Sequence, residues 1–305
     1  MTGPDDVLVK TEYCGICGTD ITNFKLKMYQ VPLIMGHEFT GEVVQIGQHV
    51  TGVKVGDKVC GINVSLDIGQ GELSGMGIFE DGGFAEYVKV PIKYLFHIPQ
   101  GISTKEAVMI ESFANAARGT RLSKIGNNQN IVIIGAGNIG LCFLTYLISE
   151  RNPNYIVVIE PHSFLRDIAK EFGASESFPP IMAKIKKFLK KNGTPDYIFD
   201  CAGNEKTLKM ALDLIKKGGT ILLEGVYKGS VSIPMFIINS KEVCIKGVLG
   251  HDREDILNSI NFFTQKKVDA NKFITEKVQL KEIQNAFEKF LKDGERKFVK
   301  IVVEI

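Results

Sequence analysis

Hydrophobic and polar positions follow one pattern in the first third of this chain and another in the remainder. In the first third, short segments in which hydrophobic and polar residues alternate are separated by turns that contain glycine, which predicts half-buried strands. These strands are expected at residues 7–13, 42–46 and 82–90, with one more beginning within 53–59. A helix is expected at residues 21–29 with Asp20 as its N-cap, and the glycine-rich segment 63–81 is expected to be a loop. The first third therefore predicts a mostly β domain.

From residue 130 onward, the pattern is that of strands alternating with helices. Residues 131–134 form a continuous β-branched hydrophobic run, which is typical of a strand covered on both faces. Further strands are expected at 155–159, 197–199, 220–224 and 242–249, and helices at 141–150, 164–172, 181–191, 206–216 and 253–265. This alternation predicts an α/β fold with a doubly wound parallel sheet.

The change of pattern predicts two domains. A helical pattern at 104–123 leads from the mostly β region into the α/β region. The first domain is expected to span residues 1–115 and to be completed by residues 269–305, because the tail at 298–304 alternates again and suits a strand that rejoins it. The second domain is expected to span residues 116–268.

Composition narrows the class of protein. With 44% hydrophobic residues, 24% charged residues and a formal net charge of +2, the chain has the composition of a soluble globular protein. The basic run at 184–191 is expected to be the solvated face of an amphipathic helix. Hydrophobic runs fall short of the ~20 residues that span a bilayer, and the N-terminal sequence lacks a secretory signal. We therefore expect a cytoplasmic protein that binds neither membrane nor nucleic acid, with its 6 cysteines outside any disulfide framework.

Three short stretches carry the residue types that bind a transition metal. The sequence Gly-His-Glu-Phe-Thr-Gly places His37 beside Glu38, a Cys-Gly-Ile-Cys turn ends at Cys17, and Glu111 stands alone in a run of hydrophobic and small residues. Glu111 could be only a salt-bridge partner, but an acid in such a setting needs a cation, and zinc would provide one. A thiolate, an imidazole and carboxylates brought together by folding would bind zinc, with an open position if the site is catalytic.

A glycine-rich turn, Gly-Ala-Gly-Asn-Ile-Gly, follows the first buried strand of the α/β region and opens a helix, and an acid ends the next strand. This context is typical of a dinucleotide-binding turn, in which the pyrophosphate lies on the helix N-terminus. The acid, Glu160, would bind the ribose hydroxyls and repel a 2′-phosphate, which favours NAD over NADP. The alternative is a turn in a fold that has lost its cofactor. The cofactor-binding residues expected from the motif are Gly135, Gly137, Asn138, Ile139, Gly140 and Glu160.

These motifs together resemble those of the medium-chain zinc-dependent alcohol and polyol dehydrogenases. Gly-His-Glu with Gly41 and Gly47 matches the family's zinc signature, Ile-Cys-Gly-Thr-Asp at 16–20 is similar to its cysteine turn, and residues 82–87 are similar to the segment that re-enters its catalytic domain. The resemblance covers almost the whole chain. It implies a GroES-like, mostly β catalytic domain joined to a Rossmann domain, with the active site between them.

The resemblance also implies roles for individual residues. Glu111 falls where the sorbitol- and threonine-type branch of the family has a glutamate, and Glu38 matches an acid that either binds the zinc or supports a ligand. Asp20 would hold the second ring nitrogen of His37, and Thr19 would pass the substrate proton outward. The implied catalytic residues are thus Thr19, Asp20 and Glu38, and the implied metal ligands are Cys17, His37, Glu38 and Glu111.

Three further residues are implied to lie near the cofactor. Val248 and Gly250 match backbone groups beside the nicotinamide carboxamide, and Lys300 matches a cation beside the pyrophosphate. His251 is expected to be a satisfied polar position, with contact to the substrate as the alternative. In the implied reaction, zinc lowers the pKa of the substrate hydroxyl, Thr19 relays its proton, and the nicotinamide takes the hydride.

The chain departs from the family pattern in three places. The interval between the strands near residues 59 and 84 holds only Cys60 where relatives often carry four closely spaced cysteines, so we expect one catalytic zinc and no structural zinc. Thr22 stands where a relay histidine is common. The chain also begins later than the family usually does, so the strands formed by that earlier segment would be missing.

The implied function is that of a zinc- and NAD-dependent dehydrogenase acting on the secondary alcohol of a polyol, sugar alcohol or hydroxy-amino acid. An NADPH-dependent zinc reductase of a carbonyl substrate and a non-catalytic dinucleotide-binding protein are the alternatives. Strand-like hydrophobic segments at 231–233 and 242–249 are expected near a sheet edge. Pairing through that edge would give a homodimer or homotetramer.

Overall fold

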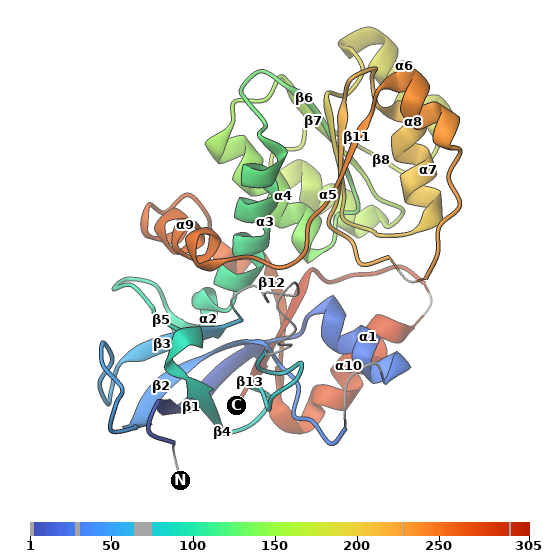
Figure 1. Ribbon diagram of the computed structural model, residues 1–305. Coiled ribbons are helices and arrows are strands. Elements are labelled where there is room, and N and C mark those ends of the chain that lie inside the picture. The colour runs from blue at the N-terminus through green and yellow to red at the C-terminus, as the bar shows by residue number, and fades with distance from the viewer. Residues whose placement is uncertain (1–2, 28–30, 64–74, 228, 293) are drawn as a thin grey trace. The chain divides into compact units, whose positions relative to one another are not determined.

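The computed structural model describes residues 3–27, 31–63, 75–227, 229–292 and 294–305. By its contacts the chain divides into two compact units (Figure 1). Unit 1 comprises Met1–Ala114, Gly250–Gly294 and Phe298–Ile305, and unit 2 comprises Asn115–Leu249 and Glu295–Lys297. The sequence placed residues 250–268 in the second domain, whereas their contacts group them with unit 1.

Unit 1 is built on a mostly antiparallel sheet, in which seven strands are found among the described residues. The strands are β1 (Asp6–Gly15), β2 (Glu38–Ile46), β3 (Lys58–Ile62), β4 (Tyr87–Pro91), β5 (Leu95–His97), β12 (Ile274–Gln279) and β13 (Lys300–Glu304). Their order is β12-β13-β1-β2-β3-β5, with β4 also paired to β1, and only β12 and β13 run parallel. Because β13 pairs with β1, placing Val303 opposite Cys14, the C-terminal tail rejoins the first domain as the sequence predicted.

The side chains of β1 explain its central place in this sheet. Val7 and Val9 are fully buried while Lys10 is exposed, as expected for a strand with one face on the core. Helices surround the sheet: α1 (Gly18–Leu26), α2 (Thr104–Ala107), α9 (Arg253–Thr264), α10 (Ile283–Leu291) and the first part of α3 (Ile110–Ser123). Among its described residues, the unit also contains three short 3-10 helices, Ile92–Tyr94, Ala270–Lys272 and Leu280–Glu282.

An aromatic cluster holds α9 in unit 1. The ring of Phe113 on α3 stacks on Phe262 and meets Phe263 and Phe273 edge-on, with ring centroids 5.3 to 5.5 Å apart. All four rings are buried. Such pairs add to the stabilisation from burial alone, which explains why residues that follow the last strand of unit 2 pack with unit 1.

Unit 2 contains a parallel sheet of six strands among the described residues. They are β6 (Asn130–Ile134), β7 (Tyr155–Ile159), β8 (Glu176–Phe178), β9 (Tyr197–Asp200), β10 (Thr220–Leu223) and β11 (Cys244–Gly247). The order β11-β10-β9-β6-β7-β8 is that of a doubly wound Rossmann sheet, which confirms the predicted fold class. The order reverses between β6 and β9, and such a reversal is where ligands bind in open α/β sheets.

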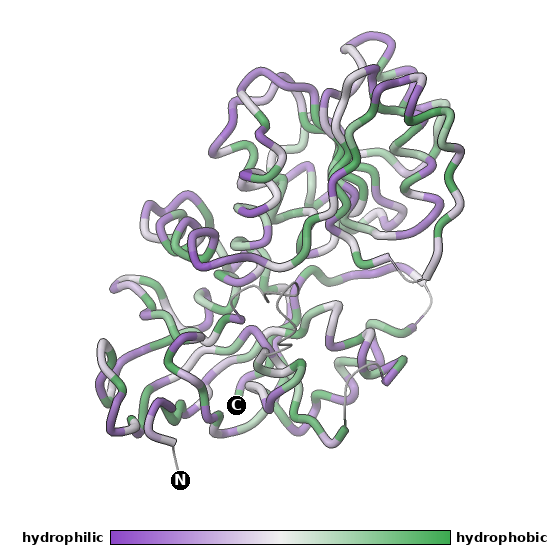
Figure 2. Tube along the Cα trace, in the orientation of Figure 1, coloured by the Kyte–Doolittle hydropathy of each residue, from purple (hydrophilic) through white to green (hydrophobic). Residues whose placement is uncertain are grey.

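Helices cover both faces of the parallel sheet. They are α4 (Asn138–Glu150), α5 (Ser163–Glu171), α6 (Met182–Asn192), α7 (Glu205–Leu214) and α8 (Met235–Lys241), with α4 and α5 on one face and α7 and α8 on the other (Figure 1). Every residue of β7 is buried, which explains why its sequence is continuously hydrophobic instead of alternating. Figure 2 shows hydrophobic residues concentrated along these strands.

Local predictions differ from the structure at several points. The assignment of Asp20 as a helix N-cap is wrong, because α1 begins at Gly18 with Cys17 as its N-cap. Residues 231–233 form no strand and precede α8, so β11 alone supplies the predicted edge. Of the loop expected at 63–81, residues 64–74 lie outside the described residues.

None of the described helices is both long enough and apolar enough to cross a lipid bilayer.

Candidate functional site

The turn between β1 and α1 presents Cys17. The backbone N–H of Cys17 donates a hydrogen bond to Oδ2 of Asp20 (2.9 Å), so the buried carboxylate at the third position of the helix fixes the cysteine at the N-cap. Acidic side chains are favourable at this end of a helix. Thr19 lies half-buried in the same first turn. The start of α1 therefore positions Cys17, Thr19 and Asp20, three of the site residues proposed from the sequence.

His37 lies beside this turn, immediately before β2, and is buried. Its Nδ1 is 3.4 Å from Oδ1 of Asp20, as predicted for the partner of a metal-binding imidazole. Asp20 thereby contacts both the cysteine and the histidine. Burial lowers the pKa of His37, but the charges and hydrogen bonds of Asp20 and Cys17 outweigh burial and raise it well above its ordinary value of 6.5.

Cys17, His37 and Glu38 form a cluster. One potential ligand atom from each of these residues lies within 4.8 Å of the other two. His37 and Glu38 are buried, whereas Cys17 is only half-buried. The spacing of these residues in the sequence does not by itself bring them together. They converge because β1 pairs with β2.

Glu38 has a second partner, which the sequence did not predict. Its Oε2 accepts a hydrogen bond from Nζ of Lys300 on β13, and both side chains are fully buried. Burial raises the pKa of Glu38, but the charges of Lys300 and His37 outweigh burial and lower it. Burial in turn lowers the pKa of Lys300, and the charge of Glu38 outweighs that effect and raises it. A Cβ on Gly15 would lie 2.3 Å from Oε2 of Glu38, so only glycine leaves room for this ion pair.

The structure gives Lys300 a partner that the resemblance did not imply. Its expected place near the cofactor pyrophosphate stays a prediction, and in unit 1 its ammonium is paired with Glu38. The two residues are 262 positions apart, and β13 pairs with β1, which in turn pairs with β2. The lysine thus balances a buried acid of the predicted metal cluster.

Glu111 lies in the first turn of α3 and is buried next to the cluster. A hydrogen bond with Glu111 lowers the pKa of Glu38, so the two carboxyl groups are in contact. Oε1 of Glu111 is also 3.6 Å from Nδ1 of His251, a buried histidine that the sequence expected to be a satisfied polar position. The four predicted ligands therefore lie in one region of unit 1.

The donor atoms of this region fit zinc. A tetrahedral zinc has bonds of about 2.0–2.3 Å to sulfur, nitrogen and oxygen, which places its ligand atoms roughly 3.5 Å apart. The cluster atoms, within 4.8 Å of one another, need only a small contraction to reach that geometry. Glu38 and Glu111 are in contact, and Lys300 balances one of these two acids, so a metal cation could balance the other.

The glycine-rich turn lies between β6 and α4 in unit 2. Gly135 has a φ of 98°, and its N–H donates to the carbonyl of Ile159 on the neighbouring strand. Gly137 is the N-cap of α4, so Asn138 and Ile139 open the helix as the motif requires. A Cβ on Gly140 would come within 1.9 Å of the carbonyl oxygen of Gly135, which explains the third glycine as a site of close packing.

Glu160 follows β7 and faces this turn. Its Oε2 accepts the backbone N–H of Ala136 (2.8 Å), and its Oε1 accepts that of His162 (3.0 Å). The carboxylate is buried at the carboxyl end of the parallel sheet. It therefore stands where an acid that binds ribose hydroxyls is expected.

Arg296, which sequence reasoning missed, supplies a cation to this region. A Cβ on Gly137 would lie 3.8 Å from Nη1 of Arg296, so the guanidinium lies beside the glycine turn. Burial lowers the pKa of Arg296 to about 10, while the charge of Glu160 opposes that shift. No sequence motif marks this residue, because the segment that carries it follows α10 of unit 1.

The remaining predicted residues lie at the end of the last parallel strand. Val248 follows β11, is buried, and donates its N–H to the carbonyl of Leu223. Gly250 has a φ of 61° and is grouped with unit 1. Asp200, buried at the end of β9, was not predicted; it accepts hydrogen bonds from the N–H groups of Ala202 and Gly203 and organises the adjoining turn.

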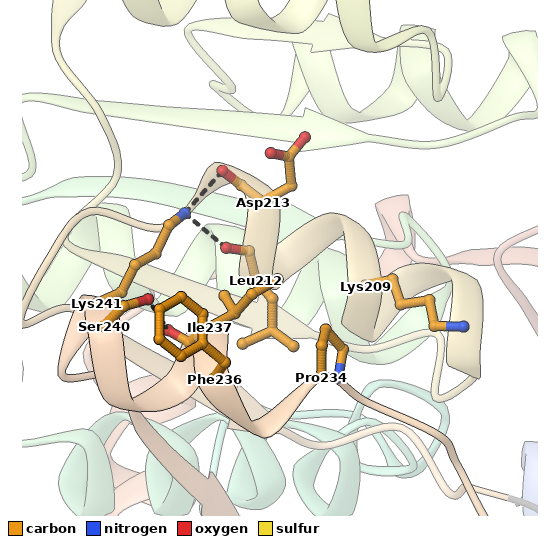
Figure 3. A pocket seen from close by; sticks show the side chains of 8 residues that line it. All are labelled: Lys209, Leu212, Asp213, Pro234, Phe236, Ile237, Ser240 and Lys241. Carbon is orange, nitrogen blue, oxygen red and sulfur yellow. Dashed lines mark hydrogen bonds between the residues drawn. The ribbon is translucent and has the colours of Figure 1, made fainter.

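A cavity of about 270 Å³ lies elsewhere in unit 2, between α7 and α8 (Figure 3). Its walls include Phe236 and Ile237, and none of the predicted site residues lines it. The one ammonium that Figure 3 shows hydrogen-bonded there, that of Lys241, donates to the carbonyls of Leu212 and Asp213 at the end of α7. The ammonium of Lys241 thus caps the C-terminus of α7. The cavity lining does not combine thiol, imidazole and carboxylate groups as the metal cluster does.

Two known protein families match this chain. Residues 3–100 match the family model "Alcohol dehydrogenase GroES-like domain", and residues 139–265 match "Zinc-binding dehydrogenase". Among curated proteins, L-threonine 3-dehydrogenase of Shewanella sp. strain ANA-3 is 28% identical over 305 residues, which cover 94% of this chain and 89% of the relative.

Solved structures are also similar over the whole chain. An alcohol dehydrogenase of Escherichia coli CFT073 complexed with NADH has a TM-score of 0.91 at 26% identity, covering 100% of this chain and 93% of the other. A zinc-binding dehydrogenase of Sinorhizobium meliloti bound to NADP has a TM-score of 0.91 at 28% identity, with the same coverage. The 2R,3R-butanediol dehydrogenase of Bacillus subtilis has a TM-score of 0.89 at 26% identity, covering 100% and 94%.

Proposed function

We propose that this protein uses NAD to oxidise a secondary alcohol. The chain belongs to the zinc-dependent medium-chain alcohol and polyol dehydrogenase family and is accordingly an oxidoreductase. The proposed substrate is a small polyol, sugar alcohol or hydroxy-amino acid. The observation that carries the proposal is the convergence of Cys17, His37 and Glu38, with Glu111 in contact with Glu38. A threonine dehydrogenase and a butanediol dehydrogenase among the similar proteins support this substrate class.

Cys17, His37, Glu38 and Glu111 are the proposed ligands of a single zinc. When bound, zinc would lower the pKa of the substrate hydroxyl, and NAD would accept the hydride. A ligand set with one thiolate, completed by nitrogen and oxygen ligands, makes the bound zinc a harder Lewis acid than a set with two thiolates does. Since His37 directs Nδ1 toward Asp20, its other ring nitrogen is the one available to the metal.

The chain's own residues prepare the site in distinct ways. Asp20 orients the imidazole and holds Cys17 at the helix start. Lys300 neutralises one oxygen of Glu38, which leaves the other for the metal or for Ser112, whose hydroxyl lies 3.4 Å away. Thr19, two residues after Cys17, is proposed to take the substrate proton and pass it outward.

The proposed cofactor is NAD. Glu160 presents a carboxylate where the adenosine ribose would lie, and a 2′-phosphate there would meet a like charge. Arg296 beside Gly137 is proposed as a further cation near the pyrophosphate, in addition to Lys300. Because one similar structure is bound to NADP, the reverse reaction with NADPH is the second candidate.

Elemental analysis of zinc, on the parent and on Cys17→Ser, tests the metal site first. We expect one zinc per chain in the parent and its loss in the variant, together with loss of NAD reduction when polyols or threonine are supplied. Glu111→Gln is expected to weaken zinc binding without removing Cys17 or His37. A parent that binds no zinc after incubation with the metal would overturn the proposal, and two zincs would reveal a second site.

A further inference from the structure

A carboxylate from near the C-terminus of the chain lies at the start of helix α5 in unit 2. Glu295 accepts hydrogen bonds from the hydroxyl of Ser163 and, through Oε1, from the backbone N–H of Phe164 (3.1 Å). These residues form the first turn of α5, where N–H groups have no partner within the helix. Glu295 therefore occupies the anion-binding end of this helix.

This helix start lies next to the acid proposed to bind the ribose. His162 links the two: its backbone N–H donates to Oε1 of Glu160, and its Nδ1 accepts the backbone N–H of Arg296 (3.1 Å). Glu160 and Glu295 thus stand on either side of one residue. A phosphate attached to the ribose that Glu160 binds would meet the first turn of α5.

We propose that Glu295 determines cofactor specificity by occupying the donors at the start of α5 and repelling a 2′-phosphate. The inference rests on the proposed dinucleotide site and adds a second acid, from the far end of the chain, to the one in the motif. A phosphate ester carries about −1.5 to −2 charges near neutral pH. With Glu295 in place, the donors in the first turn of α5 are already occupied, and the carboxylate repels the phosphate. The ribose hydroxyl of NAD carries no charge and is unaffected.

The chemistry of the segment suits this role. Hydrogen bonds from Ser163 and Phe164 lower the pKa of Glu295, so its carboxylate keeps its charge near neutral pH. The next residue, Arg296, carries its cation to the glycine turn beside Gly137. Adjacent residues thus place a positive charge near the expected pyrophosphate and a negative charge near the expected 2′ position.

The experiment measures dissociation constants of NADH and NADPH from the fluorescence of the reduced nicotinamide, which requires neither zinc nor an alcohol. Glu295→Gln keeps an oxygen for Ser163 and Phe164 but removes the charge, and Glu295→Asp keeps the charge. Glu171→Gln, at the exposed far end of the same helix, is the matched control for net charge. We expect Glu295→Gln to shift the NADPH-to-NADH preference toward NADPH by about tenfold or more, with Glu295→Asp and Glu171→Gln close to the parent.

The outcomes separate the two proposals. If the parent binds NADH and Glu295→Gln leaves the ratio unchanged, or weakens both cofactors equally, the carboxylate only docks its segment and the inference is overturned. A shift of the same size in Glu171→Gln overturns it as well. A parent that binds neither cofactor, or prefers NADPH, overturns the proposed NAD-dependent function and the inference together.

Discussion

At the scale of single residues, the buried pair of Glu38 and Lys300 governs the electrostatics of the metal cluster. Removing two charges from water is costly, and such a pair contributes little net stability compared with hydrophobic residues. Breaking it is a different matter, because the remaining charge is left buried and uncompensated. Neither Glu38 nor Lys300 can therefore be replaced alone without leaving a buried charge unpaired. Gly15 leaves the space that both side chains occupy.

Lys300→Met is expected to destabilise the metal-free protein by about 3–5 kcal/mol, because Glu38 loses its cation while the aliphatic stem is largely kept. Urea unfolding of metal-free and zinc-loaded protein measures the effect. Zinc should restore part of the loss, since it supplies a new positive charge to the same acid. Lys281→Met, at an exposed position of unit 1, is the control and should change little. Equal stability of Lys300→Met and the parent would show that Glu38 does not depend on the lysine.

The raised pKa of His37 predicts a pH-dependent zinc affinity. With a folded pKa above the ordinary 6.5, the metal-free protein holds a proton on His37 that zinc must displace. Protonation stabilises the metal-free fold fully below pH 6.5, and that contribution is lost as the pH rises through the folded pKa. Zinc also displaces the thiol proton of Cys17, so the apparent zinc affinity should rise steeply above pH 6.5 and less steeply once the folded pKa of His37 is passed.

Zinc titrations from about pH 6 to about pH 9, monitored with a competing chelator, measure this profile. The charge of Asp20 is the largest cause that raises the pKa of His37, so in Asp20→Asn the change of slope should come at lower pH than in the parent. A profile that is flat above pH 6.5, or one that Asp20→Asn leaves in place, would contradict the assigned protonation.

At the scale of elements, the buried strands and the glycine turn could be predicted because their signals are local. The hydrophobic runs at β6 and β7, and the turn that opens α4, lie where periodicity placed them. The strand β12, which pairs with β13, and the helix α10 were not predicted, and Glu38 meets Lys300 through the pairing of β13 with β1. Long-range strand pairing, which spacing does not encode, explains why the Glu38–Lys300 pair could not be predicted from the sequence.

Gly140→Ala tests whether the glycine turn needs its close packing. A methyl group would lie 1.9 Å from the carbonyl oxygen of Gly135, so the turn must open and displace the N-terminus of α4. We expect NADH affinity to fall by about tenfold or more, while zinc content is unchanged because Gly140 belongs to the other unit. Gly126→Ala, where a Cβ would meet no atom within 4 Å, is the control. Unchanged NADH affinity in Gly140→Ala would argue against this turn as the cofactor site.

At the scale of the whole molecule, the sheet of unit 2 ends in an unprotected strand. In the described part of the chain, β11 pairs only with β10 and forms one edge of the sheet. The N–H groups of Cys244 and Val248 point to that neighbour, so by alternation those of Ile245 and Gly247 point away from it. Such an edge is a template for pairing with another chain. A homodimer formed through β11 is therefore still predicted.

Gly247→Pro tests this edge with little disturbance inside the unit. Proline removes an outward N–H and blocks the approach of a second strand, whereas edge positions of this kind tolerate it within the fold. Gly247 is exposed and a Cβ there would meet no atom within 4 Å, so Gly247→Ala is a matched control. We expect light scattering to show a dimer or tetramer for the parent and Gly247→Ala, and a smaller species for Gly247→Pro with unchanged secondary structure. A monomeric parent would exclude edge pairing, and an oligomer that survives the proline would place the interface elsewhere on the molecule.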